Sequence, residues 1–118
     1  MAKRADGTLE HDIMAVLWGA DRPLLPAEIR DRLPVPLAYN SVATVLGRLH
    51  IKGLVTRHEA GRAFKYEAAV NESQLAVRNI AELYASASDK RQVLAGFFGT
   101  LPKKDIAAVR AMLDDGDS

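Results

Sequence analysis

The sequence predicts a mainly α-helical protein with one small β-hairpin, arranged as a winged helix-turn-helix domain followed by a second, helical module. Three observations support this fold class. Apolar residues recur at helical spacing in three segments before residue 53, and the segment that follows alternates with the period of two that is typical of strands. Further helical stripes begin after residue 70. We therefore place the two domains at residues 1–70 and 71–118.

The first two helices are short and bounded by recognisable end signals. Leu9–Trp18 has apolar residues at i, i+4, i+7 and i+8, with Thr8 in front of it as a candidate N-cap. A second helix of about two turns opens at Pro26, because proline suits the first helical position. It ends before Pro34, which cannot continue a helix.

A third helix is expected from Tyr39 to Lys52. Gly53 follows at the C′ position, where glycine is favoured. Two strands, Leu54–His58 and Ala63–Glu67, come next, joined by a four-residue turn that contains glycine. The predicted core face of this third helix consists of Val42, Val45, Leu46 and Leu49.

Three more helices are expected after residue 70. Asn71–Gln74 resembles a capping box, Ser88 or Asp89 is a candidate N-cap, and Pro102 is a candidate start for the last helix. A region of 48 residues can bury only a small core by itself. We therefore interpret it as the α-helical dimerisation module of a homodimer. The alternative is that its apolar stripes pack onto the first domain. The predicted interface residues are Ile80, Leu83, Tyr84, Val93, Leu94, Phe97, Phe98, Ile106, Val109 and Leu113.

The composition is that of an ordinary globular protein. Lys and Arg number 16 and Asp and Glu 15, giving a formal net charge of +1, and 48% of the 118 residues are hydrophobic. Cysteine is absent, which excludes disulfides, thiol nucleophiles and zinc fingers. No segment resembles a signal peptide or reaches the roughly 20 apolar residues of a membrane span. We expect a soluble cytoplasmic protein.

The placement of charge is more informative than its sum. Residues 32–58 are 27 consecutive positions without Asp or Glu, and they include Arg48, Lys52 and Arg57. This window covers the third helix and the start of the hairpin, the two elements that contact DNA in winged helices. A chance gap on a solvated face explains the window alone equally well.

The outward face of the third helix is a second indication of DNA binding. With the apolar stripe inward, Asn40, Thr44 and Arg48 face outward, with Ser41 beside them. Asn pairs with adenine, Ser and Thr bond base edges or phosphates, and the Thr methyl packs against thymine. On the hairpin, Arg62 and Lys65 are candidate phosphate or minor-groove contacts, although both are also ordinary exposed residue types.

Three segments, Leu37–Leu49, Lys52–Val55 and Gly61–Tyr66, resemble the signature of the BlaI/MecI/CopY penicillinase-repressor family, and Leu9–Trp18 is similar to its opening helix. The resemblance covers roughly residues 8–113. It implies a homodimeric winged-helix repressor that binds a palindromic operator in double-stranded DNA, with intertwined C-terminal helices. Carried over by position, it assigns DNA binding to Tyr39, Asn40, Ser41, Thr44, Arg48, Lys52 and Arg62.

Departures from the family pattern set further expectations. Relatives often have Thr or Lys at the places of Asn40 and Ser41, so the operator is expected to differ. Ile51 replaces a usually polar residue and is expected to be exposed. Some members are inactivated by cleavage of an Asn-Phe bond, and Gly96-Phe97 is the matching position here. Because Gly stands in place of the Asn, release by that cleavage is not predicted. Copper-responsive members carry a C-terminal cysteine cluster, and this chain has no cysteine, so copper sensing is not predicted either.

The sequence offers little for catalysis or metal binding. His11, His50 and His58 lack the close spacing of metal ligands, and neither a phosphate loop nor a serine nucleophile motif is present. We therefore expect a protein that is not an enzyme and has no cofactor or metal. The competing interpretation is a winged helix that binds another protein instead of DNA, since fold alone does not specify the partner. The sequence identifies no small-molecule effector.

Overall fold

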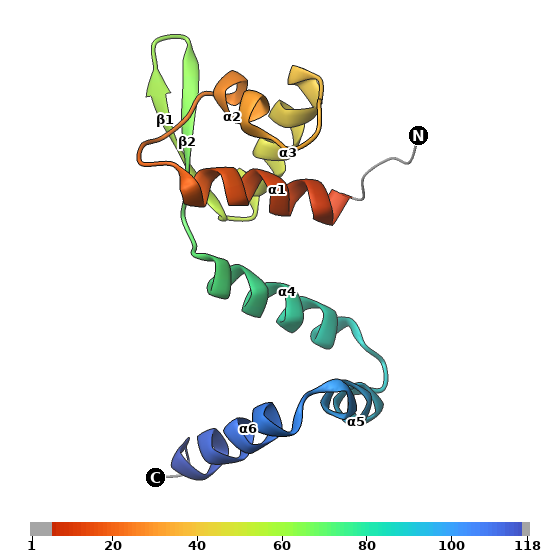
Figure 1. Ribbon diagram of the computed structural model, residues 1–118. Coiled ribbons are helices and arrows are strands. Elements are labelled where there is room, and N and C mark those ends of the chain that lie inside the picture. The colour runs from red at the N-terminus through yellow and green to blue at the C-terminus, as the bar shows by residue number, and fades with distance from the viewer. Residues whose placement is uncertain (1–5, 117–118) are drawn as a thin grey trace. The chain divides into compact units, whose positions relative to one another are not determined.

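The computed structural model describes residues 6–116 (Figure 1). Residues 1–5, to which the expectation of no signal peptide applies, and residues 117–118 lie outside that description. No helix in the described range is long and apolar enough to cross a membrane. The elements are α1 (Asp6–Gly19), α2 (Pro26–Arg32), α3 (Tyr39–Ile51), β1 (Val55–Ala60), β2 (Ala63–Ala68), α4 (Glu72–Ser86), α5 (Lys90–Thr100) and α6 (Lys103–Gly116).

The helices of the winged-helix region follow the predicted order, with one wrong cap. Helix α1 begins at Asp6, so Thr8 lies within its first turn and is not the N-cap. Helix α2 starts at Pro26 as expected, and the Glu28 carboxylate accepts a hydrogen bond from the Leu25 backbone N–H at 2.9 Å. The Leu25 side chain cannot cap the helix in return, because leucine has no atom that accepts a hydrogen bond.

The core of this region lies between α1, α2, α3 and the hairpin. One face of α3 is completely enclosed by apolar side chains from the other elements, which is the face that its sequence period predicts. Leu75, near the start of α4, also belongs to this core. The side chains no more than 2% exposed are Ile13, Met14, Leu24, Ile29, Val42, Val45, Leu46 and Leu49.

The hairpin is longer and its turn tighter than predicted. Ala60 pairs with Ala63, so only Gly61 and Arg62 form the turn instead of four residues. Gly61 has a φ of 67°, which is typical of a type II′ turn with glycine at its first central position. Leu24 adds a single antiparallel bridge to Tyr66, with N–O distances of 2.9 and 2.7 Å. This bridge holds the loop before α2 against the wing.

Helix α3 ends in a Schellman motif. The N–H of Gly53 donates to the His50 carbonyl at 3.0 Å, and the N–H of Leu54 donates to the Leu49 carbonyl at 2.9 Å. Gly53 has a φ of 78°, as the predicted C′ position requires. The helix therefore stops within one residue of the expected end and turns the chain directly into β1.

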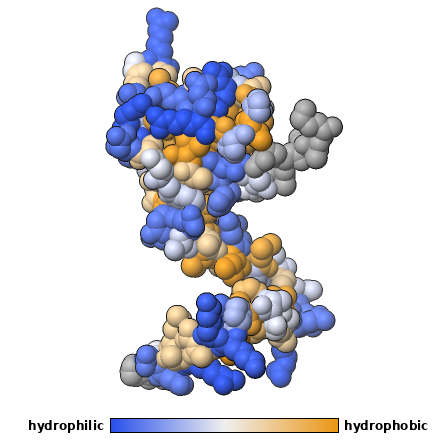
Figure 2. Space-filling view, viewed as in Figure 1, coloured by the Kyte–Doolittle hydropathy of each residue, from blue (hydrophilic) through white to orange (hydrophobic). Residues whose placement is uncertain are grey.

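Helices α4 and α5 have side-chain caps at their starts, and α4 to α6 are poorly buried. Asn71 and Gln74 exchange two hydrogen bonds of 2.8 Å at the start of α4, which confirms the capping box. The Asp89 carboxylate accepts from the Gln92 N–H at 3.0 Å at the start of α5. By compactness the chain divides into two units between Val77 and Arg78, within α4. Neither α5 nor α6 has a buried side chain, and hydrophobic surface is visible on these helices in Figure 2.

We predict that Gly53→Ala lowers the free energy of unfolding by about 1–2 kcal/mol, because a Cβ disfavours the left-handed conformation. Urea unfolding followed by the fluorescence of Trp18, the single tryptophan, measures this. Gly7→Ala is the matched control, since Gly7 lies in α1 without a positive φ and a Cβ there meets nothing within 4 Å. Equal effects of the two substitutions would contradict the role given to Gly53.

Candidate nucleic-acid interface

The outward face of α3 is polar and open. Asn40, Ser41, Thr44 and Arg48 are all exposed, and the opposite face of the helix is buried. Tyr39, in the first turn, is 45% exposed. The structure therefore brings five of the predicted site residues together on one helix, where the buried stripe fixes their direction.

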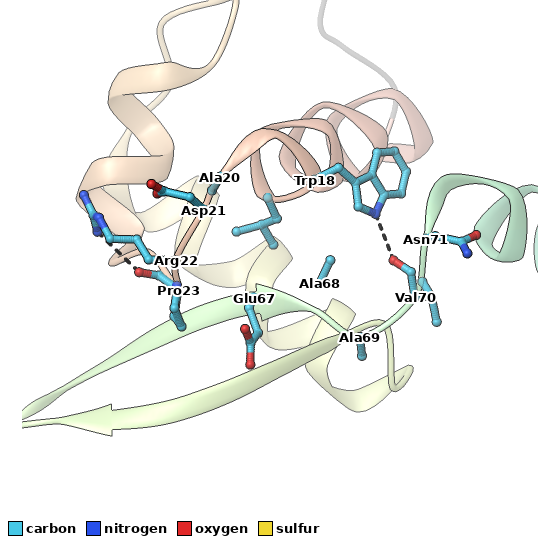
Figure 3. Close-up of a pocket in the computed structure, with 11 residues that line it drawn as sticks. Trp18, Ala20, Asp21, Arg22, Pro23, Glu67, Ala68, Ala69, Val70 and Asn71 are labelled. Carbon is cyan, nitrogen blue, oxygen red and sulfur yellow. Dashed lines mark hydrogen bonds between the residues drawn. The ribbon is translucent and has the colours of Figure 1, made fainter.

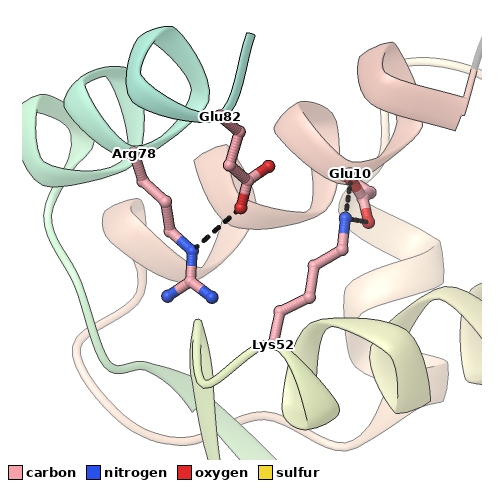
Figure 4. A network of polar contacts seen from close by, with 4 residues as sticks. All are labelled: Glu10, Lys52, Arg78 and Glu82. Atoms are coloured by element: carbon pink, nitrogen blue, oxygen red, sulfur yellow. Dashed lines mark hydrogen bonds and ion pairs between the residues drawn. The ribbon is translucent and has the colours of Figure 1, made fainter. Parts of the chain in front are cut away.

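Lys52, at the end of α3, is engaged with another helix. Its Nζ lies 3.1 and 3.0 Å from the two carboxylate oxygens of Glu10 in α1 (Figure 4). The same view includes a separate pair within α4, where Arg78 Nε lies 3.5 Å from a Glu82 oxygen. This ion pair links the end of α3 to α1. Because Glu10 offsets the charge of Lys52, the lysine attracts an external phosphate less strongly.

The two predicted wing residues occupy different surroundings. Arg62 is exposed in the hairpin turn. Lys65 is half-buried on β2, and its charge helps to lower the pKa of Glu28 in α2. Lys65 therefore lies close to a carboxylate of the protein itself, whereas Arg62 is at the hairpin tip.

Sequence reasoning missed a stacked pair on the hairpin. The Arg57 guanidinium carbon lies 4.4 Å from the centre of the Phe64 ring, a cation–π geometry. Arg57 pairs with Tyr66 and Phe64 pairs with Glu59, so Arg57 and Phe64 are diagonal neighbours across the two strands. Arg57 lies in the acid-free window, but only the strand register identifies its aromatic partner.

The ion pair with Arg22 keeps the Glu28 carboxylate, whose charge interacts with Lys65, in its ionised form. Arg22 Nη2 lies 2.7 Å from Glu28 Oε2, and this hydrogen bond, followed by the one from the Leu25 N–H, lowers the pKa of Glu28 to about 2. Its ordinary value is 4.5. The same hydrogen bond raises the pKa of Arg22. Glu28 is therefore ionised throughout the neutral and mildly acidic range.

A hollow beside these residues lies between the end of α1 and the connection from β2 to α4 (Figure 3). Trp18 Nε1 donates to the Val70 carbonyl at 2.8 Å there, which fastens the connection to α1. Two charged residues of the lining are occupied elsewhere, Arg22 by Glu28 and Glu67 by His58. Within residues 6–116, no group of three His, Cys, Asp or Glu side chains is placed to hold a metal ion.

These features define a winged-helix protein, in which α2 and α3 form the helix-turn-helix and β1–β2 the wing. The chain belongs to the penicillinase repressor family, whose model matches residues 7–115. That family consists of transcriptional repressors and not enzymes. The predicted family and fold are thus confirmed.

Individual relatives agree with this assignment. The chain is 32% identical over 85 residues to the transcriptional regulator BlaI from two strains of Mycobacterium tuberculosis, covering 70% of this chain. It spans only 62% of the length of those relatives. The solution structure of the DNA-binding domain of the repressor BlaI is similar with a TM-score of 0.50 and 28% identity, covering 62% of this chain and 92% of that one.

We predict that Glu28→Gln removes part of the acid dependence of stability. Because folding depresses the pKa of Glu28, its stabilising contribution is fully present above pH 4.5 and is lost as the pH falls towards about 2. The parent and the variant should therefore differ in free energy of unfolding at pH 7 and converge near pH 2. Glu59→Gln, on the exposed hairpin, is the control that leaves the Arg22–Glu28 pair intact. A constant difference across the pH range would refute the assignment.

Proposed function

We propose that this protein is a DNA-binding transcriptional repressor that binds a palindromic operator as a homodimer, with α3 in the major groove. The observation that carries the proposal is the outward face of α3, which is polar and exposed within 27 residues free of acid. Such a surface favours the binding of a polyanion, because residues 32–58 contain no carboxylate that would repel its phosphates. Membership of a repressor family supports the same partner.

The proposed contacts divide by chemistry. Asn40, Ser41 and Thr44 read base edges, because their side chains are short hydrogen-bonding groups on the exposed helix face. Arg48 and Arg62 bind phosphates on either side of the groove, which fixes the position of α3 without specifying sequence. Tyr39, Lys52 and Lys65 complete the proposed surface, with Lys52 and Lys65 contributing less because Glu10 and Glu28 offset their charges.

The dimer is proposed to form through residues 71–118, with residues 1–70 as the DNA-binding domain. Two observations support a dimerising role for the C-terminal helices: α5 and α6 have no buried side chain, and large hydrophobic side chains are exposed along all three of them. A second copy covers such surface with twofold symmetry, which matches a palindromic site. The proposed interface comprises Ile80, Leu83, Tyr84, Val93, Leu94, Phe97, Phe98, Ile106, Val109 and Leu113.

Release from DNA is proposed not to use cleavage of an Asn-Phe bond. Gly96 and Phe97 occupy the matching position, and both lie inside α5. Backbone within a helix is hydrogen-bonded and must unwind locally before a protease can cut it. Another signal must therefore lower the affinity for the operator.

We predict that Thr44→Ala weakens operator binding by about 1–3 kcal/mol and relaxes preference at one base position, since one base contact is lost. Mobility-shift titrations over a salt series measure this on genomic fragments that the protein retains. Thr56→Ala, an exposed threonine on β1, is the control and should bind as the parent does. Binding to no duplex at low salt, or an affinity independent of salt, would refute DNA binding and favour a protein partner.

We predict that Leu83→Lys in the full chain weakens dimerisation at least tenfold, which is about 1.4 kcal/mol, because a charge is buried in an apolar contact. Leu83 is 74% exposed in the single chain, so the substitution leaves the monomer fold intact. Ala85→Lys, exposed on another face of α4, is the control. Sedimentation equilibrium gives the dissociation constants, and identical values for the two variants would exclude this interface.

A further inference from the structure

Ile51 has an exposure that the fold does not explain. It lies in the last turn of α3 and is 86% exposed, the highest value among the exposed large hydrophobic side chains of residues 7–116. Between residues 7 and 70 only Tyr39 and Phe64 share this property, and both lie on α3 or the wing. Its side chain therefore adds nothing to the core of the free protein.

Its position on the helix places Ile51 in the middle of the polar face. At 3.6 residues per turn, Ile51 lies about 20° to one side of Thr44 and about 20° to the other side of Asn40. It shares this face with Arg48, and the whole face falls within the acid-free residues 32–58. Ile51 lies two turns, about 10 Å, beyond Thr44 along the helix axis, so a ligand that extends along this face past Thr44 also reaches Ile51.

Gly47 lies between Thr44 and Ile51 on the same face, and the free protein does not require a glycine there. Its φ is not positive, and a Cβ built on it meets nothing within 4 Å. Glycine in a helix is nevertheless less stable than alanine. The missing side chain leaves a gap one turn before Ile51, which permits the close approach of a partner to the helix backbone.

We propose that Ile51, beside the gap at Gly47, is a specificity-determining residue that packs against the 5-methyl group of a thymine in the major groove. The proposal rests on the proposed function, which brings this face to duplex DNA. The thymine methyl is the apolar group that base pairs present in the major groove, and a branched aliphatic side chain contacts it without a hydrogen bond. Residues 32–58 contain no Asp or Glu, and the Glu10 carboxylate beside Lys52 is offset by that lysine, so this face favours DNA over a basic protein surface as the occupant.

The test replaces thymines of a retained genomic fragment, one at a time, with deoxyuridine, which pairs identically but lacks the methyl. Binding of the parent should weaken about fourfold for one thymine in each half-site, the loss expected for one buried methyl. Ile51→Ala changes both protomers of the proposed homodimer, so it should bind the thymine fragment about sixteenfold more weakly, the loss of two methyl contacts, and show no further loss on the deoxyuridine fragment. Because Ile51 is exposed, this variant keeps the core, which a thermal melt verifies.

Gly47→Ala gives an independent readout. It should raise the melting temperature, because alanine favours the helix, and yet weaken operator binding by closing the gap. Gly7→Ala, also with open space around its Cβ, is the control and should leave operator binding unchanged.

The proposal is overturned if no thymine substitution affects the parent, if Ile51→Ala loses as much as the parent on deoxyuridine, or if Gly47→Ala binds normally. A parent protein that binds no duplex overturns the proposed function together with this contact, whereas normal salt-dependent binding without a methyl effect overturns the contact alone.

Discussion

The burial of one face of α3 is the interaction on which the rest of the structure depends. Val42, Val45, Leu46 and Leu49 are no more than 2% exposed, so rotating the helix would bring several apolar side chains into water. That cost fixes the rotation of α3 about its axis, and the polar residues between the buried ones consequently point outward. The proposed recognition surface is therefore the geometric complement of the core.

Contacts at the two ends of the helix-turn-helix hold this surface in place. The Schellman motif at Gly53 leads α3 directly into β1, and Lys52 joins the end of α3 to Glu10 of α1. The bridge from Leu24 to Tyr66 attaches the loop before α2 to the wing. Backbone hydrogen bonds thus link α3 and the wing in addition to the core contacts. These links make the two elements rigid relative to each other, as a binding surface formed by both requires.

The C-terminal helices follow a different logic. Their ends are stabilised locally, by the Asn71–Gln74 capping box and by Asp89, but α5 and α6 bury no side chain. Caps contribute roughly 1 kcal/mol each, and isolated helices of this length are marginal in water. Further stability in this region requires an additional apolar surface, which the proposed second copy would provide with twofold symmetry.

The sequence by itself determined what depends on neighbours along the chain: the order of the helices and strands, the buried face of α3, the glycine at its end and two of the caps. These features follow from residue spacing, which a single chain displays directly. Only the tertiary structure decided the partners of the charged residues, because Glu10 and Lys52 are 42 positions apart and Lys65, whose charge acts on Glu28, lies on β2 whereas Glu28 lies on α2. It also decided the two-residue turn and the Arg57–Phe64 stack, since strand register depends on pairing across the hairpin and not on composition.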